Sequence, residues 1–388
     1  MRPPPPRGRR TGGSLTRLAL LAASSLVLLA LAAASALLLL FAPPAPAPAP
    51  AQLLRLRVRR PPLLRLRLAS FDIRNEHNVT GVSGVWLDWR DRADAVAAAI
   101  RASAPAVVGV QEASRAQVDD LLARLPGFAA VAHGRRGRNA SEAAAVLYDA
   151  RALRLVAART FWLSPTPGVV GSVAREWGAL LPRVATVVTL LPRRRGGGAG
   201  APAFGRSPFT VVNTHLDHDG RLARERGAEM VRDAALAAAA GGAAGAGAGE
   251  GVVEPLPAPD PAADDAPPAA GAPVFITGDL NSGPRERPAA LIGAGGFVDL
   301  LARFGGPGAA APLRERDAPP PAEADLPVFS TFHNFSGVGV ASVPRLDYIF
   351  ALAGCGLRGA AWVDREARGG VWPSDHFAVV ADVEYQCD

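Results

Sequence analysis

Short runs of β-branched and apolar residues recur from residue 65 to residue 385, and they constrain the fold more than any other feature of the chain. Many runs are wholly apolar, as expected for strands in sheets that are covered on both faces. Only three helical patterns separate them, at residues 89–103, 114–125 and 221–239, and Ser114 is a suitable N-cap for the second. Strands therefore outnumber helices, and the sequence predicts a layered α/β sandwich in one domain. The eight runs are 65–73, 106–111, 144–148, 184–191, 209–216, 273–280, 345–351 and 377–385.

The N-terminus indicates export. Residues 1–17 form a basic tail without an acid, and residues 18–42 carry no charge and exceed the roughly 20 residues that cross a bilayer. This pattern is typical of a signal peptide or a signal-anchor, and the length of the apolar run favours the anchor. Residues 43–65 form a proline-rich, then basic, linker. Under either interpretation the remainder crosses the membrane, so we expect a membrane-anchored lumenal or extracellular domain, or a secreted one.

Glycosylation sequons and cysteines agree with an exported protein. Asn78, Asn139 and Asn334 each stand in an Asn-x-Ser/Thr sequon. There are two cysteines, Cys355 and Cys387. An export route permits a disulfide between them, and two separate thiols are an equally good interpretation.

The predicted domain spans residues 66–388 and is interrupted by a low-complexity insertion at 237–272, which is rich in Ala, Gly and Pro. Its charge gives no general support to a nucleic-acid partner. Residues 1–67 hold 11 of the 42 basic residues and no acid, which leaves 31 basic and 35 acidic residues, a net charge of −4, for the rest. The excess of basic over acidic residues therefore lies in the N-terminal segment that precedes the domain.

Polar residues gather where the predicted strands begin or end. A carboxylate or imidazole is costly to bury alone, so a sheet that repeatedly places such groups at strand ends is expected to collect them around a ligand. Oxygen donors suit a hard cation such as Mg²⁺ or Mn²⁺, whereas Zn²⁺ prefers more His and Cys. Histidines beside such a metal are typical of metal-assisted phosphoester hydrolysis. The residues are Asp72, Glu112, Asn213, His215, Asp279, Asn281, Asp347, Asp375 and His376.

Six ordered blocks resemble the endonuclease/exonuclease/phosphatase family, and the resemblance runs from Leu66 to Glu384. It is closest to a secreted and bacterial branch of poorly defined substrate. It implies a DNase I-like four-layer α/β sandwich, in which helices flank two packed mixed β-sheets, and a metal-dependent phosphoesterase activity. The blocks are "SFDIR", "GVQE", "NTHLDH", "TGDLNSGP", "RLDYIF" and "SDHFAVV".

The resemblance implies a metal site of three carboxylates. Glu112 is expected to be the principal ligand and Asp375 to support the ion. Asp72 stands where the family has Asn. Asp still offers an oxygen, but its charge is expected either to tighten metal binding or to weaken phosphate binding.

The resemblance also assigns catalytic roles. Asp279 and Asn281 are expected to orient and activate the attacking water and to contact the phosphate. His376 is expected to stabilise or protonate the phosphoryl oxygens, with Asp347 fixing its tautomer. On the other side of the phosphate, His215 is expected to make a contact. Glu142 resembles the acid that holds that histidine in place.

The substrate class stays open at this stage. Nucleic acid, a lipid head group and a small phosphorylated metabolite all fit a phosphoesterase, and a local arginine patch at Arg135, Arg136 and Arg138 would favour a nuclease. A catalytically silent binding module on the same fold is the alternative function. A membrane-tethered structural protein is a third, but it leaves the site residues unexplained.

Overall fold

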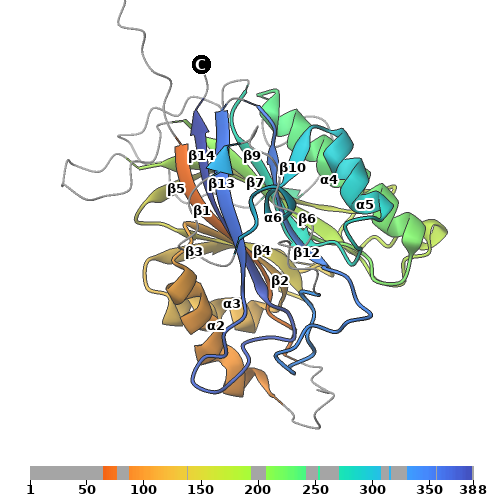
Figure 1. Ribbon diagram of the computed structural model, residues 1–388. Helices are drawn as coiled ribbons and strands as arrows, with labels where there is room; N and C mark the ends of the chain where they lie inside the picture. Colours follow the sequence, from red (N-terminus) through yellow and green to blue (C-terminus); the bar gives the residue numbers. More distant parts are fainter. Residues whose placement is uncertain are drawn as a thin grey trace, which may run out of the picture. The chain divides into compact units, whose positions relative to one another are not determined.

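Two mixed β-sheets face one another in the computed structural model, with helices on their outer surfaces (Figure 1). The first sheet has the order β11 (Arg314–Glu315), β13 (Gly356–Asp364), β14 (Ala378–Gln386), β1 (Leu64–Asp72), β2 (Val107–Ala113), β4 (Ala143–Asp149) and β3 (Phe128–Val131). The second has the order β10 (Phe297–Asp299), β12 (Asp347–Leu352), β9 (Val274–Asp279), β7 (Phe209–His215), β6 (Val184–Pro192), β5 (Leu153–Trp162) and β8 (Val252–Val253). The structure describes residues 64–76, 87–137, 139–193, 207–241, 252–253, 271–306, 314–315, 330–354 and 356–386.

Each sheet has one parallel pair of strands near its centre, and the other pairs are antiparallel. β1 runs parallel to β2, and β7 runs parallel to β9. The carboxyl ends of parallel strands meet at the same edge of a sheet, so each pair delivers the residues that follow its two strands to one place.

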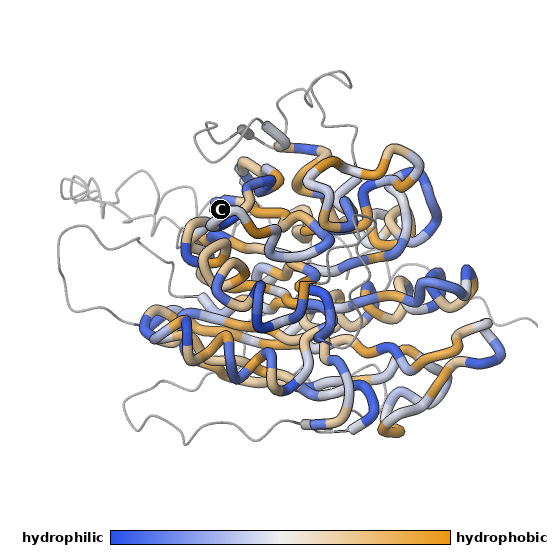
Figure 2. The backbone as a smooth tube through the Cα atoms, turned by 90° about the horizontal axis from the view of Figure 1, so that it is seen from below, coloured by the Kyte–Doolittle hydropathy of each residue, from blue (hydrophilic) through white to orange (hydrophobic). Residues whose placement is uncertain are grey.

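Helices cover the outer faces of both sheets. α2 (Trp89–Ser103) and α3 (Arg115–Arg124) pack on the first sheet, and α4 (Arg221–Ala239) and α5 (Arg287–Ala294) pack on the second. The other helical segments are η1 (Arg175–Trp177) and α6 (Leu300–Phe304). In the tube view, hydrophobic and hydrophilic residues alternate closely along the helical coils, as expected for helices with one buried face (Figure 2). The fold is therefore the predicted four-layer sandwich.

Caps define where the predicted helices begin. The side chain of Asp88 accepts a hydrogen bond from the backbone N–H of Trp89 at the start of α2. Ser114 and Gln117 form a reciprocal capping box at the start of α3, which confirms Ser114 as the N-cap. Such caps satisfy backbone N–H groups that have no partner inside the helix.

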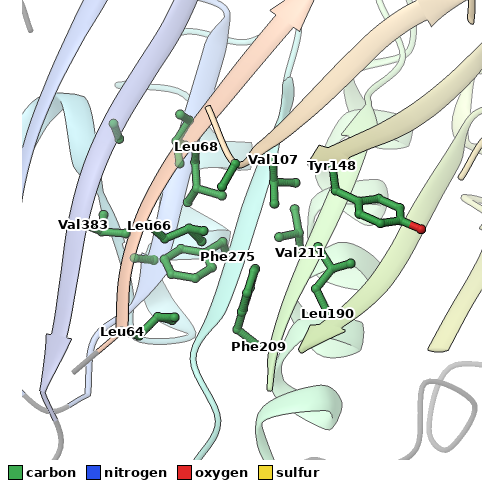
Figure 3. Packing of buried hydrophobic residues seen from close by; sticks show 14 of the residues in the cluster. Leu64, Leu66, Leu68, Val107, Tyr148, Leu190, Phe209, Val211, Phe275 and Val383 are labelled. Atoms are coloured by element: carbon green, nitrogen blue, oxygen red, sulfur yellow. The ribbon is translucent and has the colours of Figure 1, made fainter. Parts of the chain in front are cut away.

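The central core lies between the two sheets and is almost entirely aliphatic and aromatic (Figure 3). Leu66 and Leu68 of β1 point across it toward Phe275 of β9 and Val211 of β7. Phe275 also meets Tyr385 edge to face, with the ring centroids 5.8 Å apart. Burying a side chain of this size contributes about 1.5–3 kcal/mol, so this layer holds the sheets, and hence the residues at their shared edge, in register.

Buried polar contacts cross the core between the sheets at Asn213. The Nδ2 atom of Asn213, on β7, donates to the carbonyl oxygens of Val110 (3.0 Å) and Ala145 (2.8 Å) in the first sheet. Its Oδ1 atom accepts from Gln111 and from Thr277. Because a buried amide without partners is costly, this fully bonded group fixes the relative register of the two sheets.

The structure differs from the sequence predictions at several element boundaries. β1 begins at Leu64, two residues before the predicted start of the domain. α4 continues to Ala239, and β8 pairs with β5, so residues 237–239 and 252–253 of the predicted insertion belong to regular elements. Four strands of three residues or more do not correspond to any of the eight apolar runs predicted from the sequence, namely β3, β5, β10 and β13.

Some predictions fall on residues that the structure does not describe. These are the N-terminal segments 1–17, 18–42 and 43–63, the sequon at Asn78, and both cysteines. Over the described ranges, every helix is too short or too polar to span a bilayer. Of the other two sequon asparagines, Asn139 is exposed and Asn334 is partly exposed.

Candidate active site

A backbone irregularity in the first sheet places Glu112. The pairing of β2 with β4 shifts register between Val110 and Ala113, so Gln111 and Glu112 lie opposite one residue of β4. Such a bulge re-aims side chains, and Glu112 adopts a left-handed conformation with φ 61°. Its Oε2 atom accepts a hydrogen bond from the backbone N–H of Asn75 (2.9 Å). The neighbouring strand β1 ends at Asp72, so both carboxylates stand at one edge of the sheet.

The second sheet delivers its polar residues to the same place. His215 ends β7 and is paired in register with Asp279, which ends the parallel strand β9. Asn281 follows in a left-handed conformation (φ 46°), and its backbone N–H donates to Oδ1 of Asp279 at 2.6 Å. The Nδ2 atom of Asn281 lies 2.9 Å from Nε2 of His215. With the amide as donor, Nε2 of His215 is an acceptor, and its Nδ1–H faces Asp72.

A buried carboxylate holds His376. Asp347, at the start of β12, is fully buried, and its Oδ2 atom lies 2.9 Å from Nδ1 of His376. Asp347 is also the register partner of Asp279. An Nδ1–H donated to Asp347 leaves the Nε2 atom of His376 for the site.

Asp375 lies beside the ligand groups rather than inside them. The Oδ1 atom of Asp375 is 3.2 Å from the hydroxyl of Ser374, which also donates to the carbonyl oxygen of Asp72 at 2.6 Å. The guanidinium of Arg74 lies between two acids, 3.6 Å from Asp375 and 3.7 Å from Glu112.

Two overlapping groups of side chains have the geometry of a metal site. One contains Asp72, Glu112 and His215, and the other contains Asp72, Asp279 and His376, with the ligand atoms of each group within 4.8 Å of one another. Asp72 belongs to both. Its Oδ2 atom is buried and has no hydrogen-bond partner among the described residues. An orphaned carboxylate oxygen between further carboxylates fits a divalent cation, because the ion would supply the missing positive partner.

The same environment shifts the pKa values of the acids. Burial, and then the neighbouring Glu112 carboxylate, raise the pKa of Asp72 well above its ordinary value. Burial first, and then Asp347, raise the pKa of Asp279 to about 7. Repulsion among these acids favours protonation of some of them or binding of a cation.

The pKa values of the two histidines shift in opposite directions. Burial, followed by the positive charges of Arg183 and Arg135, lowers the pKa of His215 well below its ordinary value. Burial alone would lower the pKa of His376 too, but the adjacent carboxylates, Asp347 first, raise it well above that value. His215 is therefore neutral, with Nε2 as a hydrogen-bond acceptor, whereas His376 is a cation suited to donate to an anion.

The sequence-predicted residues thus converge, with two differences in their contacts. Glu142 was expected to hold His215, but its Oε1 atom accepts from Arg135 at 3.0 Å instead. Asp375 was expected to support the metal, but over the described residues it is in neither ligand group, whereas His215 is in one. Arg74 and Arg183 have no distinguishing sign in the sequence, because arginine occurs throughout the chain.

Comparisons with known proteins identify the family and the fold. A model of the endonuclease/exonuclease/phosphatase family matches residues 82–376, so the chain belongs to that family. A family member from Bacteroides vulgatus has a similar structure, with a TM-score of 0.60, 22% identity, and 83% of this chain and 99% of that chain covered. A mannosyl-6-phosphatase from Bacteroides thetaiotaomicron gives a TM-score of 0.59 at 22% identity, with 82% and 99% covered.

More distant structures share the fold as well. A TDP2 structure from Danio rerio, complexed with a single-strand DNA product, gives a TM-score of 0.50 at 14% identity, with 82% of this chain and 98% of that chain covered. A search of curated protein sequences gives no match. At these identities the solved structures establish the DNase I-like fold, and the family match establishes membership.

Proposed function

We propose that the protein is a divalent-metal-dependent phosphoesterase that hydrolyses a phosphoric ester by in-line attack of an activated water. The observation that carries this proposal is the meeting of Asp72, Glu112, Asp279, His215 and His376, from both sheets, at one edge of the sandwich. Purely structural acids would be paired with cations, and Asp72 keeps a buried oxygen that has no hydrogen-bond partner in the described part of the chain.

The metal would be held by Asp72 and Glu112, with His215 beside Asp72 and Asp375 next to the group. Mg²⁺ or Mn²⁺ suits this oxygen-rich set, and when bound it supplies Lewis-acid stabilisation of the phosphoryl oxygens. The Asp72 carboxylate adds a negative charge that a family-typical Asn would not bring. We therefore expect the charge of Asp72 to favour cation binding.

The remaining residues have separate roles, one in proton transfer from the attacking water and one in stabilising the charge on the phosphoryl oxygens. Asp279, with a pKa of about 7, is suited to take a proton from the attacking water, and Asn281 positions its carboxylate. The water oxygen bonds to phosphorus as the ester P–O bond breaks, and the leaving oxygen takes up a proton to become an alcohol. His376, kept cationic by Asp347, donates to the phosphoryl oxygens.

The substrate class is not fixed by the relatives. One solved relative is described as a mannosyl-6-phosphatase and another is complexed with single-strand DNA. In the arginine group that would favour a nuclease, Arg135 is buried against Glu142, whereas Arg136 is exposed. The third residue, Arg138, lies outside the described residues. The N-terminal apolar segment supports the further proposal that the enzyme works at a membrane or outside the cell.

A panel of phosphomonoesters and phosphodiesters, assayed with Mg²⁺, Mn²⁺, Ca²⁺ or EDTA, tests the proposal. We expect metal-dependent turnover that falls by about 10²–10⁴-fold in His376→Ala and in Asp279→Asn. Asp119→Asn, which removes an exposed carboxylate on α3, is the matched control and is expected to retain activity. Near-normal turnover in His376→Ala would remove the assigned role of that histidine. Silence on every substrate, with no metal binding by calorimetry, would favour the binding-module alternative.

A further inference from the structure

A cleft adjoins the candidate metal site and shares Glu112 and His215 with it. Two arginines from different parts of the chain, Arg135 and Arg183, line the same cleft, together with Glu142. Both arginines are more than nine-tenths buried, at 8% and 6% exposure. Arginine is rarely buried to this extent unless its charge has a partner, so the cleft raises the question of what these two cations bind.

Arg135 is fixed by its own loop. Its backbone N–H donates to the carbonyl oxygen of Glu142, and its terminal nitrogen donates to the Glu142 carboxylate at 3.0 Å. The indole N–H of Trp162 donates to its carbonyl oxygen at 2.7 Å. The Nε atom of Arg135 is buried and has no partner among the described residues. Glu142 therefore orients the guanidinium without using all of its donors.

Arg183 is held by the segment that follows His215. A terminal nitrogen of Arg183 lies 2.6 Å from Nδ1 of His218. Its Nε atom lies 3.7 Å from Oδ2 of Asp217, too far for a hydrogen bond, and both of these buried atoms lack partners in the described structure. Asp217 instead accepts at its other oxygen from the backbone N–H groups of Asp219 and Gly220.

The two guanidinium groups affect the protonation of His215 directly. Arg183 and Arg135 are the first charges that influence His215, and both disfavour its protonation. The two arginines thus place positive charge beside His215, in a cleft that Glu112 and Glu142 also line. The two arginines in the lining of the cleft suit an anion. Guanidinium groups with free N–H donors match phosphate oxygens in charge and geometry.

We propose that Arg135 and Arg183 form a subsite for a doubly charged terminal phosphate, so that the preferred substrates are phosphomonoesters rather than phosphodiesters. This inference rests on the proposed hydrolase function for its catalytic meaning. A monoester presents three unesterified oxygens and a charge near −2, which two arginines beside the metal site would stabilise. A diester presents two such oxygens and one charge, so two arginines stabilise it less than the dianion.

Binding of two non-hydrolysable or slowly hydrolysed probes tests the subsite without requiring turnover. Methylphosphonate imitates the dianion and dimethyl phosphate imitates the diester monoanion. Calorimetry of wild-type protein at pH 8.5, with Mg²⁺ and separately with EDTA, is expected to show methylphosphonate binding about tenfold or more tighter than dimethyl phosphate. Equal affinities for the two probes would overturn the proposal. Because this comparison uses only the wild-type protein, it decides the question even where a variant fails to fold.

Substitutions of the two arginines test whether they cause the preference for methylphosphonate over dimethyl phosphate. Arg183→Met and Arg135→Met are each expected to weaken methylphosphonate binding by about tenfold or more and dimethyl phosphate binding by much less. Arg183→Lys, which keeps the charge but loses the planar fork, is expected to lie between Arg183→Met and wild type. The exposed neighbour Arg136 provides the matched control, and Arg136→Met is expected to behave as wild type. Unchanged methylphosphonate affinity in folded Arg183→Met and Arg135→Met would overturn the assignment.

Turnover separates this inference from the proposed function. A hydrolase with a subsite of this kind has a higher kcat/KM for phenyl phosphates bearing one ester than for matched diesters, and Arg183→Met narrows that ratio. Hydrolysis without such a preference, together with equal probe binding, would leave the hydrolase standing and remove the subsite. Dianion-selective binding that depends on the arginines, with no hydrolysis of any ester, would retain the anion subsite and remove the catalytic proposal.

Discussion

Arg92 connects the outer helix layer to the backbone around the candidate site. It lies on α2 and is fully buried. Its guanidinium donates to the carbonyl oxygens of Ile73 (2.6 Å), Arg74 (2.8 Å) and Pro373 (2.8 Å). The first two carbonyls directly follow Asp72, and the third precedes the Ser374–Asp375 pair. One side chain therefore joins two segments that are far apart in the sequence and carry candidate ligands.

The energetic effect of removing this guanidinium is the balance of two opposed quantities. Hydrogen bonds to a charged donor contribute about 1.5–3 kcal/mol each, so three of them give about 4.5–9 kcal/mol. Against this, burial, together with the smaller effects of the neighbouring charges, lowers the pKa of Arg92 to about 10, so the charged form is about 3 kcal/mol less favourable than in water. The bonds outweigh the burial cost. We expect Arg92→Met to reduce the free energy of unfolding by about 2–5 kcal/mol.

Urea denaturation of Arg92→Met, followed by circular dichroism, measures this difference, and calorimetry with Mg²⁺ measures its effect on metal binding. The midpoint is expected to fall while the slope stays near that of wild type, and metal affinity is expected to weaken because the Asp72 and Asp375 segments lose their common anchor. Arg90→Met, an exposed substitution one position from the start of the same helix, is the control. A variant Arg92→Met within about 0.5 kcal/mol of wild type would refute this reasoning.

Two further predictions test the framework of the site. Gly109→Ala is expected to destabilise the fold by about 1–3 kcal/mol in urea denaturation, because a Cβ atom there would lie 2.2 Å from Oγ1 of Thr277 and 2.6 Å from Oδ1 of Asn213; wild-type stability would show that the sheets can separate locally. Burial against Phe377 and Trp372 lowers the pKa of His333 to about 4, whereas the pKa in the unfolded chain is near 6.5. The neutral side chain therefore makes its full contribution to the free energy of unfolding above pH 6.5, and this contribution is lost as the pH falls toward 4. Compared with His333→Gln, wild type is expected to lose about 3 kcal/mol more between pH 7 and pH 4, and parallel pH profiles of the two proteins would contradict this.

Much of the fold could be predicted because the central strands are nearly continuous apolar runs. All eight predicted runs contain strands of the two sheets, and α2 and α4 have the predicted bounds. The missed elements carry weaker signals. β5 mixes arginines with apolar residues, β13 contains two glycines, and α5 is only eight residues long, so none gives a sustained period.

The candidate site was predictable in part for a related reason. An acid or imidazole at the end of a buried strand is easily recognised in the sequence. The six blocks that resemble the family occur in the family's order, and this indicated which of these residues belong to the site. The bulge that turns Glu112 has no such sign, because no glycine marks its left-handed conformation. The pairing of Glu142 with Arg135 and the position of Arg183 beside His215 depend on loops that only the folded sheets bring together.

Backbone strain and charge repulsion are concentrated at the same edge of the sandwich. Arg74, Glu112 and Asn281 all adopt left-handed conformations, which are uncommon outside glycine and persist only where surrounding contacts enforce them. The enforcing contacts are the buried bonds of Arg92 on one side and of Asn213 on the other. The acids gathered there repel one another, and a fold selected for stability alone would have no reason to hold them together. Rigid support from outside and unrelieved negative charge inside are what a preorganised cation site requires.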